Sequence, residues 1–177
     1  EVTMSDKDSL FTLRPVASAL NQLRAAVRAQ STSAAKKAPK VSELSIAQVL
    51  KTTPGVFKEN AKNVVIKDLK RGNTRAGFPG VKAVAKDVFS KPGTRGRSHK
   101  CSIVAMDGKP VYLSKAAYFS CDCEAFLYWC EVALHAKGAA AIKFSNGEAP
   151  DTRNPRKLPM ICKHLIELAY TCKEHKF

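Results

Sequence analysis

The sequence predicts an α+β protein, because the spacing of its apolar residues changes along the chain. Up to about residue 100, apolar residues recur at helical intervals in short segments that Gly and Pro interrupt. From Cys101 the interval becomes two, which is typical of strands, and helical spacing returns after residue 124. The 177 residues, 45% of them apolar, suffice for one domain or two small ones. We expect three regions, 1–44, 45–100 and 101–177.

Residues 1–44 are predicted to form one helix and a cationic linker. The apolar stripe of the helix consists of Val16, Leu20, Leu23 and Val27. Residues 30–41 are rich in Ser and Ala, which is typical of a flexible linker. No acidic residue lies between Ser9 and Ser42, so this stretch also resembles an organelle transit peptide, and both interpretations stay open.

Residues 45–100 are predicted to hold three short helices joined by basic loops. Ser45 is a candidate N-cap for the first helix, which should end at Thr53-Pro54-Gly55. The second helix is expected between Asn60 and Gly72, and the third from Val81 to Phe89, because apolar residues group there at helical spacing. The loops between these helices contain Gly, which lets the main chain approach a ligand closely.

The positive charge of the chain is concentrated in this middle region. The whole chain has 30 Lys+Arg against 15 Asp+Glu, and residues 51–100 hold 13 of those bases but only 3 of the acids. A solvated surface would explain many charge runs, but this excess favours a polyanionic partner, and nucleic acid is the first candidate. The expected phosphate contacts are Lys67, Lys70, Arg71, Arg75, Arg95, Arg97 and Lys100. Because only Phe78 and Phe89 lie among them, we expect contact with the backbone rather than base stacking.

Residues 101–177 are predicted to form a β-hairpin followed by two helices. The expected strands are 101–106, 111–114, 117–121 (a further strand or a continuation of the second) and 139–144. Asp107-Gly108 is a typical hairpin turn between the first two strands. The expected helices are 124–137, which Gly138 ends, and a last helix that begins at Cys162 or Lys163.

Two pairs of potential metal ligands lie in this region, Cys121-Asp122-Cys123 and Cys162-Lys163-His164. Alternate side chains of a strand point to the same side, so Cys121 and Cys123 can face one ion. Three thiolates and an imidazole suit one tetrahedral zinc ion. Six cysteines in 177 residues are too few for a disulfide scaffold. In a reducing compartment, clustered cysteines favour a metal over disulfides.

The order of these pairs resembles the SWIM zinc finger. Residues 118–126, YFSCDCEAF, resemble the strand, ligand pair and following aromatic residue of that family. Residues 158–165, LPMICKHL, resemble its proline, second ligand pair and helix start. The resemblance covers about residues 101–172 and implies a β-hairpin packed on a helix around one zinc ion. It also implies a non-catalytic role in binding DNA or proteins.

The chain departs from this pattern in the 38 residues that separate Cys123 from Cys162, more than a compact finger usually has. The extra length is either an insertion or a sign of another ligand set that uses Cys130 or His135. Buried thiols without any metal are the third alternative. Cys130 also fits a core position, and His135 fits the C-terminal end of a helix. Four protein ligands would close the coordination sphere, which is typical of a structural zinc site.

These features favour a non-catalytic zinc protein that contacts nucleic acid, DNA rather than RNA, through its basic middle region. The sequence lacks P-loop, dinucleotide-binding, serine-hydrolase and His-Glu-x-x-His motifs, so we expect no enzyme. The alternative is a structural subunit of a virion or ribonucleoprotein particle whose zinc module docks on a neighbouring protein. No run of about 18 apolar residues and no secretory signal is visible. We therefore expect no membrane contact and a location in the cytoplasm, the nucleus, or a viral or organellar assembly.

Overall fold

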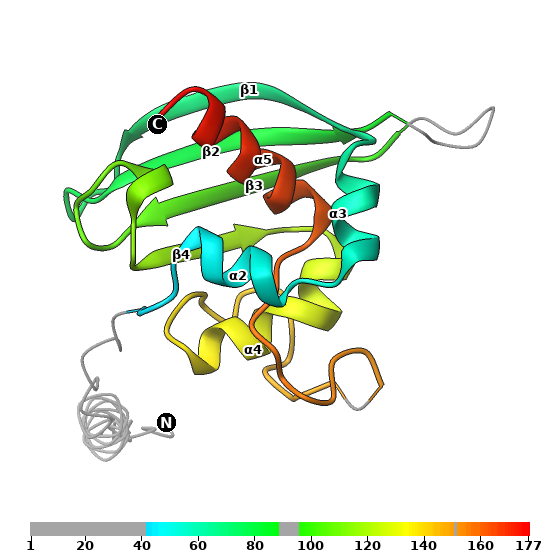
Figure 1. The fold of residues 1–177 in the computed structure, drawn as a ribbon. Coiled ribbons are helices and arrows are strands. Elements are labelled where there is room, and N and C mark those ends of the chain that lie inside the picture. The colour runs from blue at the N-terminus through cyan, green and yellow to red at the C-terminus, as the bar shows by residue number, and fades with distance from the viewer. Residues whose placement is uncertain (1–41, 89–95, 151) are drawn as a thin grey trace, which may run out of the picture. The chain divides into compact units, whose positions relative to one another are not determined.

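The computed structural model describes residues 42–88, 96–150 and 152–177, and these form an α+β fold, as predicted. One antiparallel sheet has the order β1 (Val64–Asn73), β2 (Pro79–Asp87), β3 (Ser98–Ala105) and β4 (Ala117–Cys121) (Figure 1). The helices are α2 (Ile46–Thr52), α3 (Gly55–Ala61), α4 (Glu131–Ala136) and α5 (Lys163–Glu174), with a 3-10 turn η1 (Val111–Leu113) and a π-helical turn η2 (Phe126–Cys130). The helix and linker predicted before residue 42 lie outside the described residues, as do Phe89 and Arg95.

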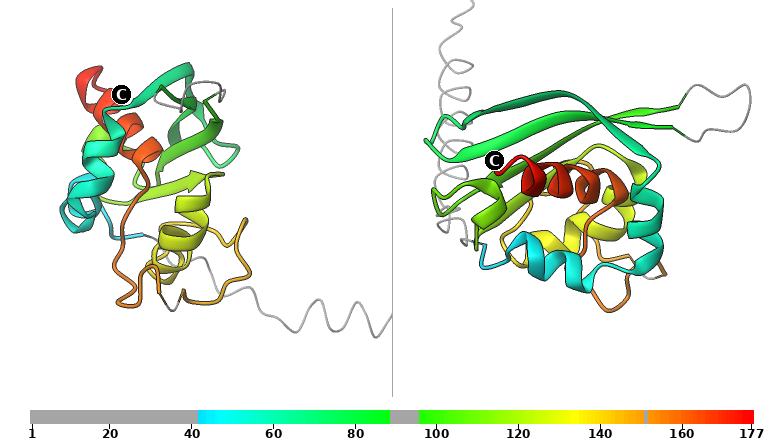
Figure 2. Two further views of the ribbon diagram at one scale, coloured as in Figure 1. Left: turned by 90° about the vertical axis from the view of Figure 1, so that its right-hand side faces the viewer. Right: turned by 45° about the horizontal axis from the view of Figure 1, so that its top comes forward.

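Helix α5 lies along the inner face of the sheet, and α3 packs against α5 from the side away from the strands (Figure 2). Leu165, Ile166 and Leu168 of α5 are fully buried, as are Ile103 of β3 and Phe119 of β4. Burying each such side chain stabilises the fold by about 1.5–3 kcal/mol. This core therefore fixes α5, and with it the start of α5, against the sheet.

Residues 64–87 form strands β1 and β2, so the second and third predicted helices are wrong. The run Val64-Val65-Ile66 is β-branched at every position, which crowds a helix and favours a strand. In β2 the buried Val81, Ala83 and Ala85 alternate with more exposed residues, which is a period of two. Gly77, with φ of +83°, closes the turn between the two strands.

The expected boundary between residues 100 and 101 falls inside β3, so 45–100 and 101–177 are not separate regions. Residues from 42 onward belong to one compact unit. Strand β2 pairs with β3 over seven residues, with Ala83 opposite Cys101. An isolated hairpin is marginally stable in water, and β1 and β2 widen the sheet enough to cover α5.

Several local predictions are confirmed. Ser45 caps α2 in a capping box with Gln48, in which its hydroxyl accepts from the Gln48 N–H at 3.2 Å. Strand β3, strand β4 and the helical segment after residue 124 lie where they are expected. Helix α5 begins at Lys163, which is one of the two predicted starts.

Two predicted strands are wrong. Residues 111–113 form the 3-10 turn η1. The Asp107 carboxylate accepts hydrogen bonds from the Ser114 hydroxyl at 2.8 Å and the Lys115 N–H at 2.9 Å, and these bonds bend the segment away from an extended conformation. Strand β4 takes its place beside β3. Residues 139–144 form no strand, although the Ala139 carbonyl accepts one hydrogen bond from the Phe119 N–H at 2.7 Å. Among the described helices, none has the length and apolar character to cross a lipid bilayer.

Candidate metal centre and lysine face

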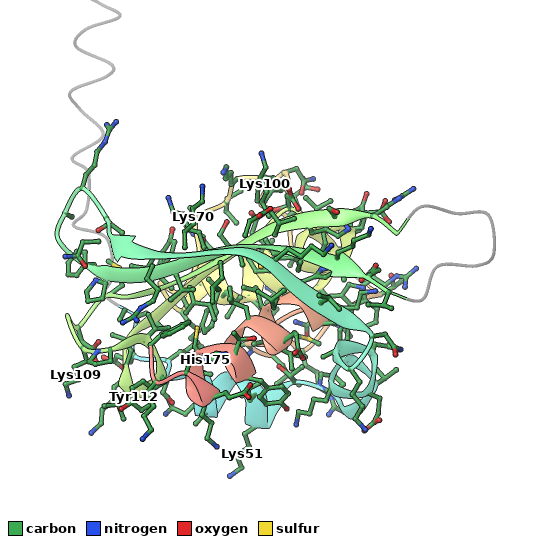
Figure 3. The ribbon with its side chains drawn as sticks, turned by 90° about the horizontal axis from the view of Figure 1, so that it is seen from above. Lys51, Lys70, Lys100, Lys109, Tyr112 and His175 are labelled. Carbon is green, nitrogen blue, oxygen red and sulfur yellow. The ribbon has the colours of Figure 1, made fainter. Side chains whose placement is uncertain are left out.

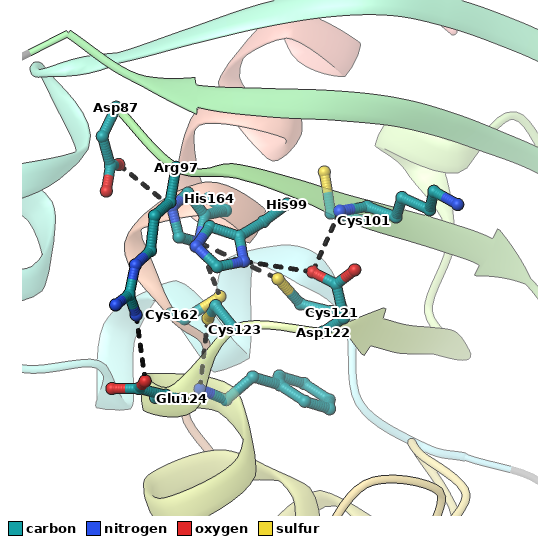
Figure 4. Close-up of polar contacts among 12 residues, drawn as sticks. Asp87, Arg97, His99, Cys101, Cys121, Asp122, Cys123, Glu124, Cys162 and His164 are labelled. Atoms are coloured by element: carbon teal, nitrogen blue, oxygen red, sulfur yellow. Dashed lines mark hydrogen bonds and ion pairs between the residues drawn. The ribbon is translucent and has the colours of Figure 1, made fainter. Parts of the chain in front are cut away.

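Cys121, Cys123, Cys162 and His164 come together at the junction of β4 and α5 (Figure 4). All four side chains are buried, and their ligand atoms lie within 4.8 Å of one another. The Sγ atoms of Cys121 and Cys162 lie 3.8 Å and 4.0 Å from Nδ1 of His164. Ligand bonds of about 2.0–2.3 Å around a tetrahedral ion place its ligands ~3.6–3.8 Å apart. The four residues can therefore hold one metal ion.

The 38 residues between the two ligand pairs include η2, α4 and a long loop, and their described part packs so that Cys162 and His164 lie beside the end of β4. Phe126 and Leu134 of this segment are buried in the core, and the Ile161 N–H donates to the Thr53 hydroxyl at 3.1 Å just before Cys162. The alternative ligands have other partners. Cys130 Sγ donates to the Ala125 carbonyl at 3.6 Å, and His135 Nδ1 lies 3.0 Å from the Ala140 carbonyl oxygen.

The pKa values of the three thiols in the cluster shift in different directions. A hydrogen bond with Cys123 raises the pKa of Cys121, and burial raises the pKa of Cys162. Hydrogen bonds from these two thiols lower the pKa of Cys123. A divalent cation would stabilise all three as the thiolates that bind metals.

Asp87, at the end of β2, orients the His164 imidazole from outside the cluster. Its Oδ1 lies 3.1 Å from His164 Nε2, and its Oδ2 pairs with Lys163 Nζ at 2.9 Å. Burial alone would raise the pKa of Asp87, but the hydrogen bonds from Lys163 and His164 outweigh it and leave that pKa below its ordinary value. With its Nε2–H donated to this carboxylate, His164 presents the Nδ1 lone pair to the thiols.

We expect the Asp87→Asn variant to bind the metal about 10–100-fold more weakly, because the imidazole loses the carboxylate that orients it. Competition with a chelator of known affinity measures the change. Asp107→Asn is the matched control, since Asp107 also accepts hydrogen bonds but lies outside the cluster. Equal metal affinity of both variants and wild type would show that Asp87 does not support the site.

The other three cysteines are buried singly. Burial raises the pKa of Cys101 to about 12 and that of Cys172 to about 11, and it raises the pKa of Cys130 as well. These side chains stay protonated at neutral pH and pack as small apolar groups. All six cysteines are free thiols.

The outer face of the sheet, opposite α5, carries a set of exposed lysines from three strands and one loop. We name it the lysine face, and it consists of Lys67, Lys70, Lys82, Lys86, Lys100 and Lys143. Figure 3 shows Lys70 and Lys100 on this side, whereas Lys51 and Lys109 lie on the opposite side. Among the described residues, no carboxylate forms an ion pair with any of the six.

The predicted phosphate contacts divide between this face and other places. Lys67, Lys70 and Lys100 lie on the lysine face. The guanidinium carbon of Arg71 lies 4.3 Å from the centroid of the Phe177 ring, and Arg97 forms an ion pair with Glu124 at 3.1 Å. Arg75 is exposed in the β1–β2 turn, and Arg95 is outside the described residues.

Three lysines of this face were not among the phosphate contacts predicted from the sequence: Lys82, Lys86 and Lys143. The alternation of apolar residues with lysine in 81–86 is the signal that could have placed Lys82 and Lys86 on one face. Lys143 reaches the lysine face from a loop, which no local pattern indicates. Asp87 was also missed, because only the packing of α5 on the sheet brings His164 to it.

No protein-family model, curated protein or solved structure matches this chain.

Proposed function

We propose that this protein binds one structural zinc ion in a SWIM-like site and contacts nucleic acid through the lysine face, without catalysis. The observation that carries the proposal is the position of the Cys3His cluster at the end of β4, next to a sheet face whose six lysines have no ion-pair partner among the described residues. The cluster holds the sheet and α5 together, and the sheet presents the lysines.

The donor set supports zinc as the metal. Three sulfur atoms and one imidazole nitrogen in a tetrahedral arrangement are typical of structural zinc and unsuited to calcium or magnesium, which prefer oxygen. Four protein ligands leave no position for water or substrate, so the site supports folding rather than a reaction. The Cys-x-Cys and Cys-x-His order, with a helix that starts at the second pair, supports the SWIM-like assignment.

The charge of the lysine face supports a polyanionic partner. Lys70 and Lys82 are direct cross-strand partners on the same face. Like charges in this position destabilise a sheet unless an anion lies between them. Lysine ammonium groups bind phosphate as point charges, which gives affinity with little sequence preference.

Asp122 supports a link between the metal cluster and the lysine face. It lies between two ligands, Cys121 and Cys123, and its carboxylate accepts from the Lys100 N–H at 3.0 Å. The same oxygen lies 3.1 Å from Nδ1 of His99, whose ring packs on His164 with centroids 4.5 Å apart. Metal binding at the cluster would therefore hold the end of β4 and the Lys100 backbone in place.

Equilibrium binding of the zinc-loaded chain to labelled 20-nucleotide DNA and RNA strands and to a 20-base-pair DNA duplex tests this function. We expect binding of at least one of these at 50 mM salt that weakens as salt rises. Absence of binding to all of them would contradict the proposal. We further propose a reducing compartment, which the six free thiols support. The assembly role stays a prediction.

A further inference from the structure

We propose that a hollow in the lysine face seats one unpaired nucleotide of a single strand, with its phosphate among the lysines and its base against Phe144. This inference rests on the proposed function, since nucleic acid must be the partner. It goes beyond that function because it selects single strands over duplexes.

The hollow has a volume of about 660 Å³ and lies over the middle of the sheet. Its size is within the ~300–1,000 Å³ of sites that hold one small organic molecule. Ser102 and Ser120, on neighbouring strands, offer hydroxyl groups in it, and Val84 and Phe144 offer apolar surface. A duplex keeps its bases stacked and paired, so only an unpaired nucleotide can place a base in such a hollow.

The charge around the hollow fits a phosphate. Four lysines line it, Lys70, Lys82, Lys100 and Lys143. Asp68 and Asp122 are its acidic lining residues, and Asp122 is already bonded to His99 and the Lys100 N–H. The excess of positive charge, including the directly opposed Lys70 and Lys82, would be relieved by a bound phosphodiester.

Phe144 is held at the wall of the hollow by a buried carboxylate. Glu131 is fully buried and accepts from the N–H groups of Lys143, Phe144 and Ser145 at 3.0, 3.1 and 2.7 Å. Burial alone would raise the pKa of Glu131, but these hydrogen bonds lower it, so the carboxylate is charged at neutral pH. This anchor fixes the loop before any ligand binds, which lowers the entropy cost of binding.

The Phe144 ring is accessible to a base. The residue is 37% exposed, and Lys143 Nζ lies 4.9 Å from the ring centroid. Phe144 is the one aromatic residue that lines this hollow within the described part of the chain. Stacking of a base on an aromatic ring contributes about tenfold in affinity in single-strand-binding proteins and does not depend on sequence.

The test compares the zinc-loaded wild type with the Phe144→Ala variant, on a 12-nucleotide deoxythymidine strand and on a 12-base-pair duplex. We expect the variant to bind the single strand about tenfold more weakly and the duplex within about twofold of wild type. Phe144→Tyr should restore single-strand affinity. Tyr170→Ala, which removes an exposed aromatic side chain from α5, is the matched control and should leave both affinities unchanged.

The outcomes separate this inference from the proposed function. If wild type binds neither of these oligonucleotides nor RNA, the proposed function fails. If wild type binds the duplex but not the single strand, or if Phe144→Ala leaves the single-strand affinity unchanged or weakens both affinities equally, the lysine face remains a nucleic-acid surface and the single-nucleotide site is overturned. Zinc content and far-UV circular dichroism of each variant confirm that it is folded.

Discussion

Replacing Cys162 by Ser is expected to abolish stoichiometric zinc binding and to lower the free energy of unfolding by about 5 kcal/mol or more. Structural zinc sites contribute about 10–16 kcal/mol of apparent binding energy in zinc-finger peptides, which is comparable to the whole stability of a domain. Cys162 directly precedes α5 and lies in the cluster, so losing the metal frees the start of the helix that covers the sheet. Chelation of wild type should have the same effect.

Elemental mass spectrometry of the metal and near-UV circular dichroism measure this result. The Trp129 ring packs edge-on against Phe57 with centroids 5.3 Å apart, so its signal reports the packing of η2 on α3. Cys172→Ala is the matched control. It removes a buried thiol from the same helix but outside the cluster, and should keep one zinc ion per chain. One zinc ion per chain in Cys162→Ser would contradict the ligand set, and none in wild type would contradict zinc itself.

Affinity for single-stranded nucleic acid is expected to fall about 300-fold between 50 and 200 mM salt. If all six residues of the lysine face neutralise phosphates, the slope of log affinity against log salt is about −4 on single strands. The double variant Lys70→Gln/Lys100→Gln should lose about 100-fold in affinity at 50 mM salt, and its slope should become less steep by about 1.4. Both effects follow from the release of fewer counterions.

Fluorescence anisotropy over a salt series measures both quantities. Lys51→Gln/Lys109→Gln is the matched control, because it removes the same charge from the opposite side of the sheet (Figure 3). We expect the control to lose little affinity, because it removes only long-range attraction, and to keep the same slope of log affinity against log salt. Equal losses in the two double variants would mean that net charge, and not the lysine face, attracts the strand.

Local signals in the sequence were enough to predict the parts of the fold that depend on neighbouring residues. The capping box at Ser45 specifies the start of α2 through bonds within four residues. The alternation in 101–105 specifies a half-buried strand. The two ligand pairs around Asp122 and Lys163 predicted the metal cluster, because each pair carries its spacing within three residues and the donor chemistry is specific.

The prediction failed where the outcome depends on pairing between distant segments. Apolar residues in 64–69 fit a helical face about as well as a strand, and only a partner strand can decide between them. Val64 pairs with Asp87 and Ile66 with Ala85, and these contacts, together with the cover of α5, select the strand. Short apolar runs carry too little local preference to resist such tertiary contacts.

The sequence by itself determined the α+β class, the cysteines and histidine that can hold a metal ion, and the basic middle region. The tertiary structure alone decided which bases share a surface and which residues support the metal ligands. Lys143 joins the lysine face because the buried Glu131 holds its loop, and Asp87 reaches His164 because β2 ends beside α5. These contacts join residues that are 12 and 77 positions apart in the sequence, so no local pattern encodes them. Distant segments come together because folding buries the apolar core as a whole.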